Sequence, residues 1–422
     1  MWSNEKDRAL RERAAEVIPG GMYGHQSTAL LPEDYPQFFT RAEGTRITDA
    51  DGNEYIDFMC GYGPNLLGYG HPDIARVVAE QQARIDTSTG PSPLIVDLAE
   101  ALTGMISHAD WAMFCKNGAD ATMMGLMMAR AYRGKRKVLL AKNAYHGSMP
   151  WNTPRPGGVV AEDRAHFIYF DYNDPQALTD AVKQAGDDLA GIFAAPFRHD
   201  TFADQGLPDA EYARTARRLA DENDALLIVD DVRAGFRMAR DCSWETVGVR
   251  PDLSCWGKVL GNGQPISAIV GSNRAREAAQ SIFVTGSYWF SAVPMAAAIE
   301  TLRLIRETDY LEHITMIGDQ FRKGLVEQAA DFGFALKHTG PSTIPMVLFE
   351  EDPDFKLGYG FCRAAMKRGV YMSPYHNMFM NAAMTRTDIA DTLEATGAAF
   401  EDIKQSRASL KPLAALAALM EA

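Results

Sequence analysis

The sequence has 422 residues, 46% of them hydrophobic, which is enough apolar material for a large core and a smaller second domain. Its formal net charge of −13 argues against a nucleic-acid partner, because binding phosphates requires clustered basic side chains. The five cysteines show no C-x-x-C spacing and the nine histidines no H-E-x-x-H pair, so we expect reduced thiols and no metal site. The charged N-terminus is unlike a signal peptide and no apolar run could span a membrane, so we expect a cytoplasmic protein.

The N-terminal part of the chain predicts a helix and then a β-hairpin. Residues 6–17 form a charged helical stretch that stops at Pro19-Gly20-Gly21. Residues 46–58 read RITDADGNEYIDF, in which two β-prone runs flank an Asp51-Gly52 turn. We assign residues 1–65 to a segment that joins the smaller domain.

Seven short apolar runs follow, and longer helical patterns such as Asp209–Asn223 separate several of them. Unalternating apolar runs are typical of parallel strands that helices cover on both faces. We therefore predict a large α/β domain over residues 66–300, built on a mostly parallel seven-stranded sheet. The runs are Trp111–Cys115, Lys137–Ala141, His166–Phe170, Leu189–Pro196, Ala225–Val232, Asp252–Trp256 and Ile266–Gly271.

The pattern changes after Ala296. A long helix is predicted over Met295–Arg306 and continues through Tyr310–Phe332. A strand-like stretch, STIPMVLFE, and a helix near Tyr359–Arg368 come next. These elements predict a smaller α+β domain over residues 301–422.

Residues 252–265, DLSCWGKVLGNGQP, place a lysine between an apolar strand and a glycine-rich turn. Poor solvation at such a position favours the neutral, nucleophilic amine that Schiff-base chemistry needs. Taken alone, Lys258 is better explained as a surface lysine in a glycine turn, because most lysines lie at the surface. The phosphate-loop pattern fails at Val259 and the dinucleotide-binding pattern fails at Leu66.

Residues 225–237, ALLIVDDVRAGFR, form an apolar strand that ends in Asp230 and Asp231. In open α/β sheets, ligands bind at the carboxyl ends of the strands. A carboxylate there would pair with the protonated nitrogen of a pyridine ring. The alternative for these acids is a helix or turn cap.

Residues 113–122, MFCKNGADAT, turn from a strand into a helix through Asn117, Gly118 and Ala119. The free N–H groups and the positive dipole end of such a helix favour a phosphate. Asp120 in the first helical turn is better explained as a partner of the dipole.

A fourth group, Tyr145-His146-Gly147, follows the strand KVLLAKN. An aromatic ring at a strand end can stack on a flat cofactor, although a lone aromatic residue is more often part of the core. This group is weak evidence by itself.

In this order, the four groups resemble the class III aminotransferases of fold type I, the aspartate-aminotransferase fold. The resemblance covers essentially the whole chain and includes the N-terminal IPGG and DADGNEYIDF stretches. It implies that the cofactor is pyridoxal 5′-phosphate and that the enzyme moves an amino group from an amine to a 2-oxo acid such as pyruvate.

The resemblance also implies roles for individual residues. Lys258 corresponds to the lysine that holds the cofactor as a Schiff base. Asp230 corresponds to the acid that faces the pyridine nitrogen, and Val232 to the apolar residue under the ring. Tyr145 would stack on the ring, and Ser287 would reach the phosphate of a neighbouring subunit, which implies a homodimer with shared active sites. The other expected cofactor-binding residues are Asn117, Gly118, Ala119 and His146.

The subgroup containing glutamate-1-semialdehyde aminomutase and the β-amino-acid aminotransferases carries an arginine shortly after PGG, which grips the substrate carboxylate. This sequence has no arginine between Gly21 and Phe39. The departure implies an amine donor without an adjacent carboxylate. We nominate Tyr23, His25 and Tyr62 as substrate-binding residues at an aromatic entrance.

Two further departures from the family pattern follow the sheet strand: Asp231 stands where glutamate is usual, and Arg233 where a smaller residue is commoner. Arg198, Arg233 and Arg237 are the candidates for binding the acceptor carboxylate. Stretches such as VDDVRAGFRMARDCSW give a closer resemblance to enzymes that deaminate long-chain aminopolyols such as hydrolysed fumonisin. The alternatives are an aminomutase, a β-amino-acid aminotransferase and a non-catalytic pyridoxal-phosphate-binding protein.

Overall fold

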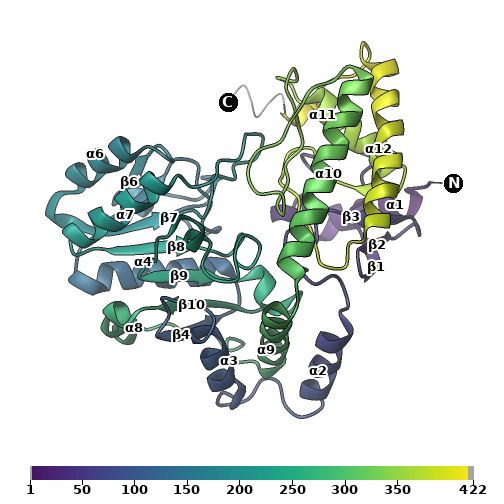
Figure 1. Ribbon diagram of the computed structural model, residues 1–422. Helices are drawn as coiled ribbons and strands as arrows, with labels where there is room; N and C mark the ends of the chain where they lie inside the picture. The colour runs from purple at the N-terminus through teal and green to yellow at the C-terminus, as the bar shows by residue number, and fades with distance from the viewer. Residues whose placement is uncertain (1, 417–422) are drawn as a thin grey trace. The chain divides into compact units, whose positions relative to one another are not determined.

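The computed structural model describes residues 2–416, which form two compact units (Figure 1). The terminal unit contains the chain up to Tyr62, Leu67–His71 and the chain from Glu312 onward. The central unit contains Gly63–Leu66 and Pro72–Leu311. The domain boundaries near residues 65 and 300 stay a prediction. No helix among the described residues is both long and apolar enough to cross a bilayer.

The central unit is built on a seven-stranded sheet in the order β4-β10-β9-β8-β7-β5-β6. Every predicted strand is present, and only β10 runs antiparallel to its neighbours β4 and β9. The predicted mostly parallel sheet is therefore confirmed. The strands are β4 (Trp111–Cys115), β5 (Lys137–Ala141), β6 (Phe167–Phe170), β7 (Leu189–Ala194), β8 (Leu226–Asp230), β9 (Leu253–Trp256) and β10 (Ser267–Gly271).

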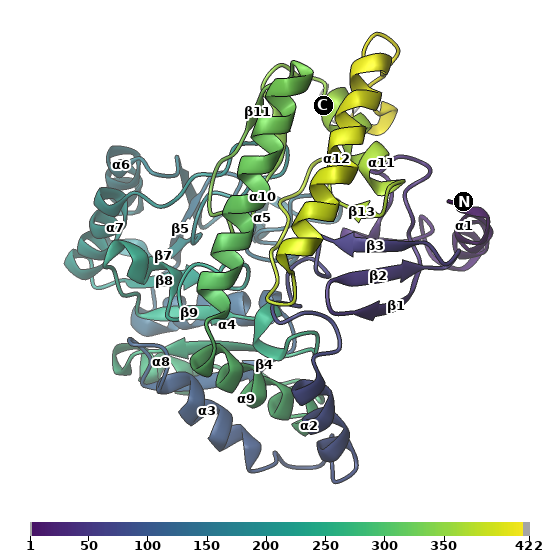
Figure 2. The same cartoon turned by 45° about the vertical axis from the view of Figure 1, so that its right-hand side comes forward.

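Helices bury the strands of the central unit, and β7 to β10 are buried along their whole length. Helix α4 packs on six of the strands, α7 on β7 and β8, and α6 on β5 and β6 (Figure 2). Continuous burial explains why these strands read as unbroken apolar runs. The main helices are α2 (Pro72–Gln82), α3 (Leu94–Thr103), α4 (Gly118–Arg133), α6 (Pro175–Ala185), α7 (Ala210–Glu222), α8 (Arg276–Ser281) and α9 (Ala292–Glu307).

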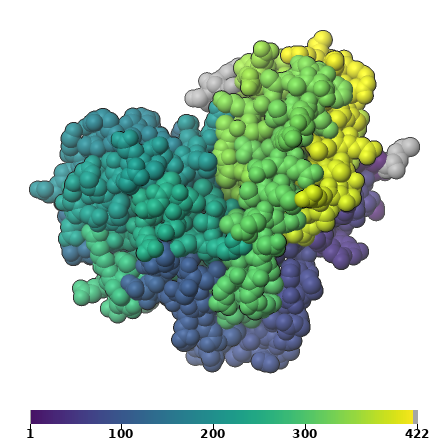
Figure 3. Space-filling view, in the orientation of Figure 1, coloured from purple at the N-terminus to yellow at the C-terminus, as the bar shows by residue number. Residues whose placement is uncertain are grey.

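The terminal unit contains a four-stranded sheet in the order β1-β2-β3-β13. The predicted hairpin is confirmed, because β2 and β3 pair antiparallel around the Asp51-Gly52 turn. Helices α10 and α12 lie side by side, joined by a 2.8 Å hydrogen bond from Thr396 Oγ1 to Gln328 Oε1, and their outer faces are visible in Figure 3. The elements are α1 (Glu5–Val17), β1 (Phe39–Glu43), β2 (Arg46–Asp49), β3 (Glu54–Asp57), α10 (Tyr310–Phe332), β11 (Leu336–Lys337), β12 (Leu348–Phe349), α11 (Lys356–Met366), β13 (Val370–Tyr371) and α12 (Arg386–Ser406).

Two expectations for the C-terminal part of the chain were wrong. The helical pattern after residue 295 is two helices, because Thr308 takes an extended conformation between α9 and α10. The stretch STIPMVLFE forms a strand only at Leu348–Phe349. The carbonyls of its earlier residues accept hydrogen bonds that belong to no β-sheet: Met378 N donates to Pro345 O, and Met380 N donates to Thr343 O. Proline cannot donate within a sheet, which fits the irregular backbone there.

Candidate active site

One edge of the central sheet collects the predicted site residues. Strands β5, β7, β8 and β9 are parallel, and β4 shares their direction because both β4 and β9 oppose β10. Cys115, Ala141, Asp230 and Trp256 therefore end their strands at the same edge. This is the edge at which open α/β sheets bind ligands.

Gly257 separates Lys258 from the end of β9, and Lys258 begins a short 3₁₀ turn. Its backbone is left-handed, with φ of 44°, a conformation that costs energy in a residue with a side chain. Burial, and then the positive charge of Arg233, lower the pKa of the Lys258 amine to about 7, while Asp230 opposes the shift. A substantial fraction of this amine is therefore neutral at physiological pH and available as a nucleophile or a proton acceptor.

Asp230 lies at the end of β8, in parallel register with Cys255 of β9. One carboxylate oxygen is 2.8 Å from Nδ1 of His146, and the other accepts the N–H of Val232 at 3.1 Å. The Asp230 and His146 side chains are 8% and 0% exposed, respectively. Asp231 points elsewhere, because its carboxylate accepts the N–H of Ser243 at 3.0 Å.

Val232 packs between the two glycine turns that the sequence singled out. A Cβ atom added at Gly118 would lie 2.5 Å from Val232 Cγ1, and one added at Gly257 would lie 3.3 Å from the same methyl group. The turn before α4, the residue before Lys258 and the loop after Asp230 therefore converge on one point. Substituting Gly118 would force one of these parts to move.

The start of α4 is the turn predicted to bind phosphate. Asn117 is its N-cap residue, and the Asn117 N–H donates to Oδ2 of Asp120 at 2.9 Å. Asp120 is thus a capping residue, in line with its expected local role. The N–H groups of Gly118 and Ala119 are in the first helical turn, where no intrahelical acceptor exists, and a phosphate would satisfy them.

The Tyr145-His146-Gly147 turn packs directly on the start of α4. Gly147 has φ of 113°, and a Cβ atom there would come within 2.8 Å of Ala119 Cβ. The carbonyl of His146 accepts a 2.6 Å hydrogen bond from Thr122 Oγ1. Thr122 ends the MFCKNGADAT stretch, but no local pattern in the sequence marks it as a partner of His146. Burial raises the pKa of Tyr145, so its hydroxyl stays protonated at neutral pH.

Ser287 is exposed in the segment between α8 and α9. Arg198 follows β7, and its guanidinium pairs with Asp200 at 2.8 Å. Arg233 and Arg237 follow β8 and are both buried.

The remaining predicted residues belong to the terminal unit. The Tyr62 hydroxyl donates to the carbonyl of His25 at 2.6 Å, and the two rings are 5.2 Å apart. Tyr23 is 73% exposed. The ring of His376 is 5.4 Å from that of Tyr62, a contact that no local pattern predicts because over 300 residues separate the two in the chain.

The central unit fits pyridoxal phosphate. It offers a lysine with a depressed pKa, first-turn N–H groups at the start of α4 that no intrahelical acceptor can reach, and a buried carboxylate oriented by a histidine. The buried Nε2 atom of His146 has no hydrogen-bond partner among the described residues, so it too is available to a bound group.

Comparison with known proteins agrees with this chemistry. The family model "Aminotransferase class-III" matches residues 31–400. The chain is 58% identical to the aminopentol aminotransferase of Sphingopyxis macrogoltabida, over 98% of each chain. It is 31% identical to the glutamate-1-semialdehyde 2,1-aminomutase of Haloarcula marismortui, over 87% of this chain and 84% of the relative.

A solved structure of a relative has the same fold as this chain. The PLP internal aldimine form of the FumI protein of Sphingopyxis sp. MTA144 matches with a TM-score of 0.97 and 58% identity, over 97% of this chain and 99% of the other. The fold class, the cofactor and the kind of enzyme expected from the sequence are confirmed. The chain belongs to the class III aminotransferases, the pyridoxal-phosphate-dependent enzymes of fold type I.

Proposed function

We propose that this enzyme moves an amino group from a long-chain amine without an adjacent carboxylate, such as hydrolysed fumonisin or a similar aminopolyol, to a 2-oxo acid such as pyruvate. The observation that carries the proposal is the 58% identity to an aminopentol aminotransferase over nearly the whole chain. The absence of arginine between Gly21 and Phe39 supports it, because that stretch offers no bidentate partner for a donor carboxylate. Tyr23, His25 and Tyr62 are the proposed donor-binding residues.

Each residue of the site has a proposed task. Asn117, Gly118 and Ala119 hold the phosphate at the start of α4. Tyr145 and Val232 hold the ring. Pyridoxal phosphate, when bound, supplies an aldehyde that carries the amino group and a ring that withdraws electrons from the reacting carbon.

Proton movements are assigned to two residues. Lys258, with its pKa near 7, takes a proton from the amine-bearing carbon of the donor and returns it in the reverse direction for the acceptor. Asp230 keeps the pyridine nitrogen protonated. His146 orients Asp230 through the 2.8 Å contact at Nδ1 and excludes water, since its own side chain is fully buried.

We further propose a cytoplasmic homodimer with shared active sites, in which Ser287 reaches the phosphate site of the other subunit. Large apolar side chains beside Ser287 support an interface there: Phe283 is 86% exposed, Tyr288 66% and Phe290 40%. Apolar patches of this kind mark contact surfaces. Light scattering should give the mass of two chains, and Ser287→Ala should weaken cofactor retention without splitting the dimer.

A panel of amine donors tests the proposal. Purified holoenzyme is mixed with pyruvate and with paired donors that have the same chain but differ in a carboxylate next to the amine. Formation of alanine should be fastest with the long-chain donors that lack the carboxylate. A clear preference for the α- or β-amino acid of each pair would contradict the proposal.

Three alternatives make different predictions. A glutamate-1-semialdehyde-type aminomutase, favoured by the 31% identical relative, needs no net acceptor, so its activity would not depend on any oxo acid. A non-catalytic binding protein would stay unlabelled at Lys258 when the reconstituted protein is treated with borohydride. A β-amino-acid aminotransferase would favour donors with a carboxylate one carbon further from the amine.

A further inference from the structure

The proposed reaction needs a cation for the acceptor carboxylate, because a buried carboxylate without a partner is costly. Three arginines follow strands of the central unit at the ligand-binding edge. Arg237 is 0% exposed, and its Nη2 donates to the carbonyl of Gly63 at 2.8 Å. Arg198 has 47% of its side chain exposed and pairs with Asp200. Both are therefore committed to structural contacts, one in the core and one at the surface.

Arg233 has a different environment. It is 8% exposed and directly follows Val232, the residue on which the glycine turns converge. Its charge lowers the pKa of the Lys258 amine more than the charge of Arg237 does, while Tyr145 and Asp230 act on Arg233 in turn. Burial lowers the pKa of Arg233 to about 10, so the side chain is still cationic at neutral pH. Its positive charge therefore acts within the group of residues that surround the reactive amine.

We propose that Arg233 binds the carboxylate of the 2-oxo acid and so selects this acceptor over carbonyl compounds without a carboxylate. The inference rests on the proposed function. A guanidinium has five N–H donors in a planar fork, enough to hold two carboxylate oxygens while keeping contacts with protein neighbours. The acceptor carboxylate brings a further negative charge into a site that already holds the buried Asp230, and the buried cation Arg233 would balance that charge.

The test compares two acceptors on the aminated holoenzyme: pyruvate, and acetaldehyde, which has hydrogen in place of the carboxylate. Arg233→Gln should lower kcat/KM for pyruvate by roughly 10- to 100-fold, the range for lost hydrogen bonds between charged groups. Any effect of Arg233→Gln through the pKa of Lys258 should be shared by acetaldehyde and by the amine half-reaction, so the loss with pyruvate should exceed both of those losses by about tenfold, because neither involves the acceptor carboxylate. Arg233→Lys keeps the charge without the fork and should recover part of the pyruvate rate.

A binding measurement supports the kinetics. Propionate is an unreactive carboxylate, and its inhibition constant should rise about tenfold in Arg233→Gln. The matched control is Arg136→Gln, which removes an exposed arginine paired with Asp188 at 2.9 Å and should change neither quantity. Absorbance of the bound cofactor checks each variant, and Arg233→Lys carries the comparison if Arg233→Gln does not retain the cofactor.

Three results would overturn the assignment: equal losses with pyruvate and acetaldehyde, an equal loss in the amine half-reaction, or loss of pyruvate selectivity in Arg198→Gln instead. If the unaltered holoenzyme accepts no 2-oxo acid, the proposed function itself fails, and the assignment of Arg233 fails with it. These outcomes separate an error in the residue from an error in the reaction.

Discussion

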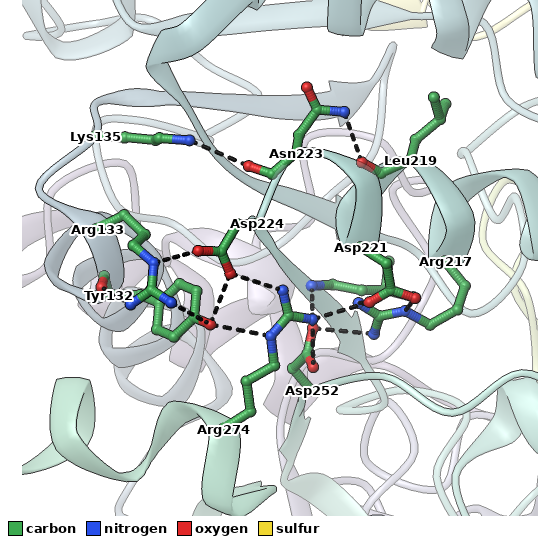
Figure 4. A network of polar contacts seen from close by, with 11 residues as sticks. Tyr132, Arg133, Lys135, Arg217, Leu219, Asp221, Asn223, Asp224, Asp252 and Arg274 are labelled. Atoms are coloured by element: carbon green, nitrogen blue, oxygen red, sulfur yellow. Dashed lines mark hydrogen bonds and ion pairs between the residues drawn. The ribbon is translucent and has the colours of Figure 1, made fainter.

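The two edges of the central sheet use the same residue type in opposite ways. Asp252 precedes β9, and its carboxylate is held by Arg217 at 2.9 Å and by Arg274 at 3.3 Å (Figure 4). It also accepts the N–H of Leu227 at 2.8 Å. Asp230 ends β8 at the other edge, where its carboxylate contacts Nδ1 of His146 at 2.8 Å.

Both side chains are 8% exposed, so burial alone does not distinguish the two aspartates. The difference lies in their partners. Arg274, one of the cations that neutralise Asp252, also pairs with Asp221 and Asp224. Such a network of ion pairs stabilises a buried charge. Asp230 is oriented mainly by a histidine and an N–H group, which leaves its charge able to act on a bound group.

The largest expected effect on turnover comes from a substitution at the ligand-binding edge. Lys258→Ala removes both the attachment point and the proton carrier, so turnover should fall by at least about 10³-fold. Single-turnover absorbance with a good donor measures it. The control is Lys142→Ala, an exposed lysine paired with Asp171 at 2.9 Å, which should be fully active. A Lys258→Ala enzyme with ordinary turnover would refute the central assignment.

A matched pair of substitutions then tests the contrast itself. Asp230→Asn should lower kcat roughly 100- to 1,000-fold, as for the loss of one preorganised electrostatic partner, with little change in stability. Asp252→Asn should leave kcat unchanged and lower the free energy of unfolding by roughly 2–3 kcal/mol, because it breaks a largely buried charge network. Kinetics and urea denaturation of both variants measure these effects. Similar effects of the two substitutions would show that the edges do not differ as argued.

The strands and the site residues of the sheet edge were predictable because each depends on local sequence. An unalternating apolar run identifies a strand such as β8, and the residue that ends it identifies a ligand position. The 2.8 Å contact between His146 and Asp230 was not predictable, since 84 residues separate them and nothing local marks the pairing. The irregular backbone at Thr343 and Pro345 was missed for the same reason, because its partners are Met378 and Met380.

The pKa of Lys258 predicts how the apo-protein captures its cofactor. Only the neutral amine attacks an aldehyde, so the capture rate should rise about tenfold per pH unit below pH 7 and level off above it. The folded-state pKa lies below the usual lysine value of 10.5, so the unfolded chain binds more protons between pH 7 and 10.5. Stability of the apo-protein should therefore rise with pH in that window, and less so in Lys258→Ala. A capture rate that does not change between pH 5.5 and 8 would contradict the depressed pKa.

The smallest expected effect is on stability, and it distinguishes the exposed Asp224 from the buried Asp252 in the same network of ion pairs. Asp224 precedes β8 and accepts hydrogen bonds from Arg133, Tyr132 and Arg274, which hold its pKa at about 2, yet half of its side chain is exposed. Water and salt screen such a carboxylate, so Asp224→Asn should cost only about 0.5–1 kcal/mol, and 1 M NaCl should remove most of that loss. The loss in Asp252→Asn should persist in the same salt, because its charges are shielded from solvent. If salt cancels both losses equally, burial is not what makes this edge structural.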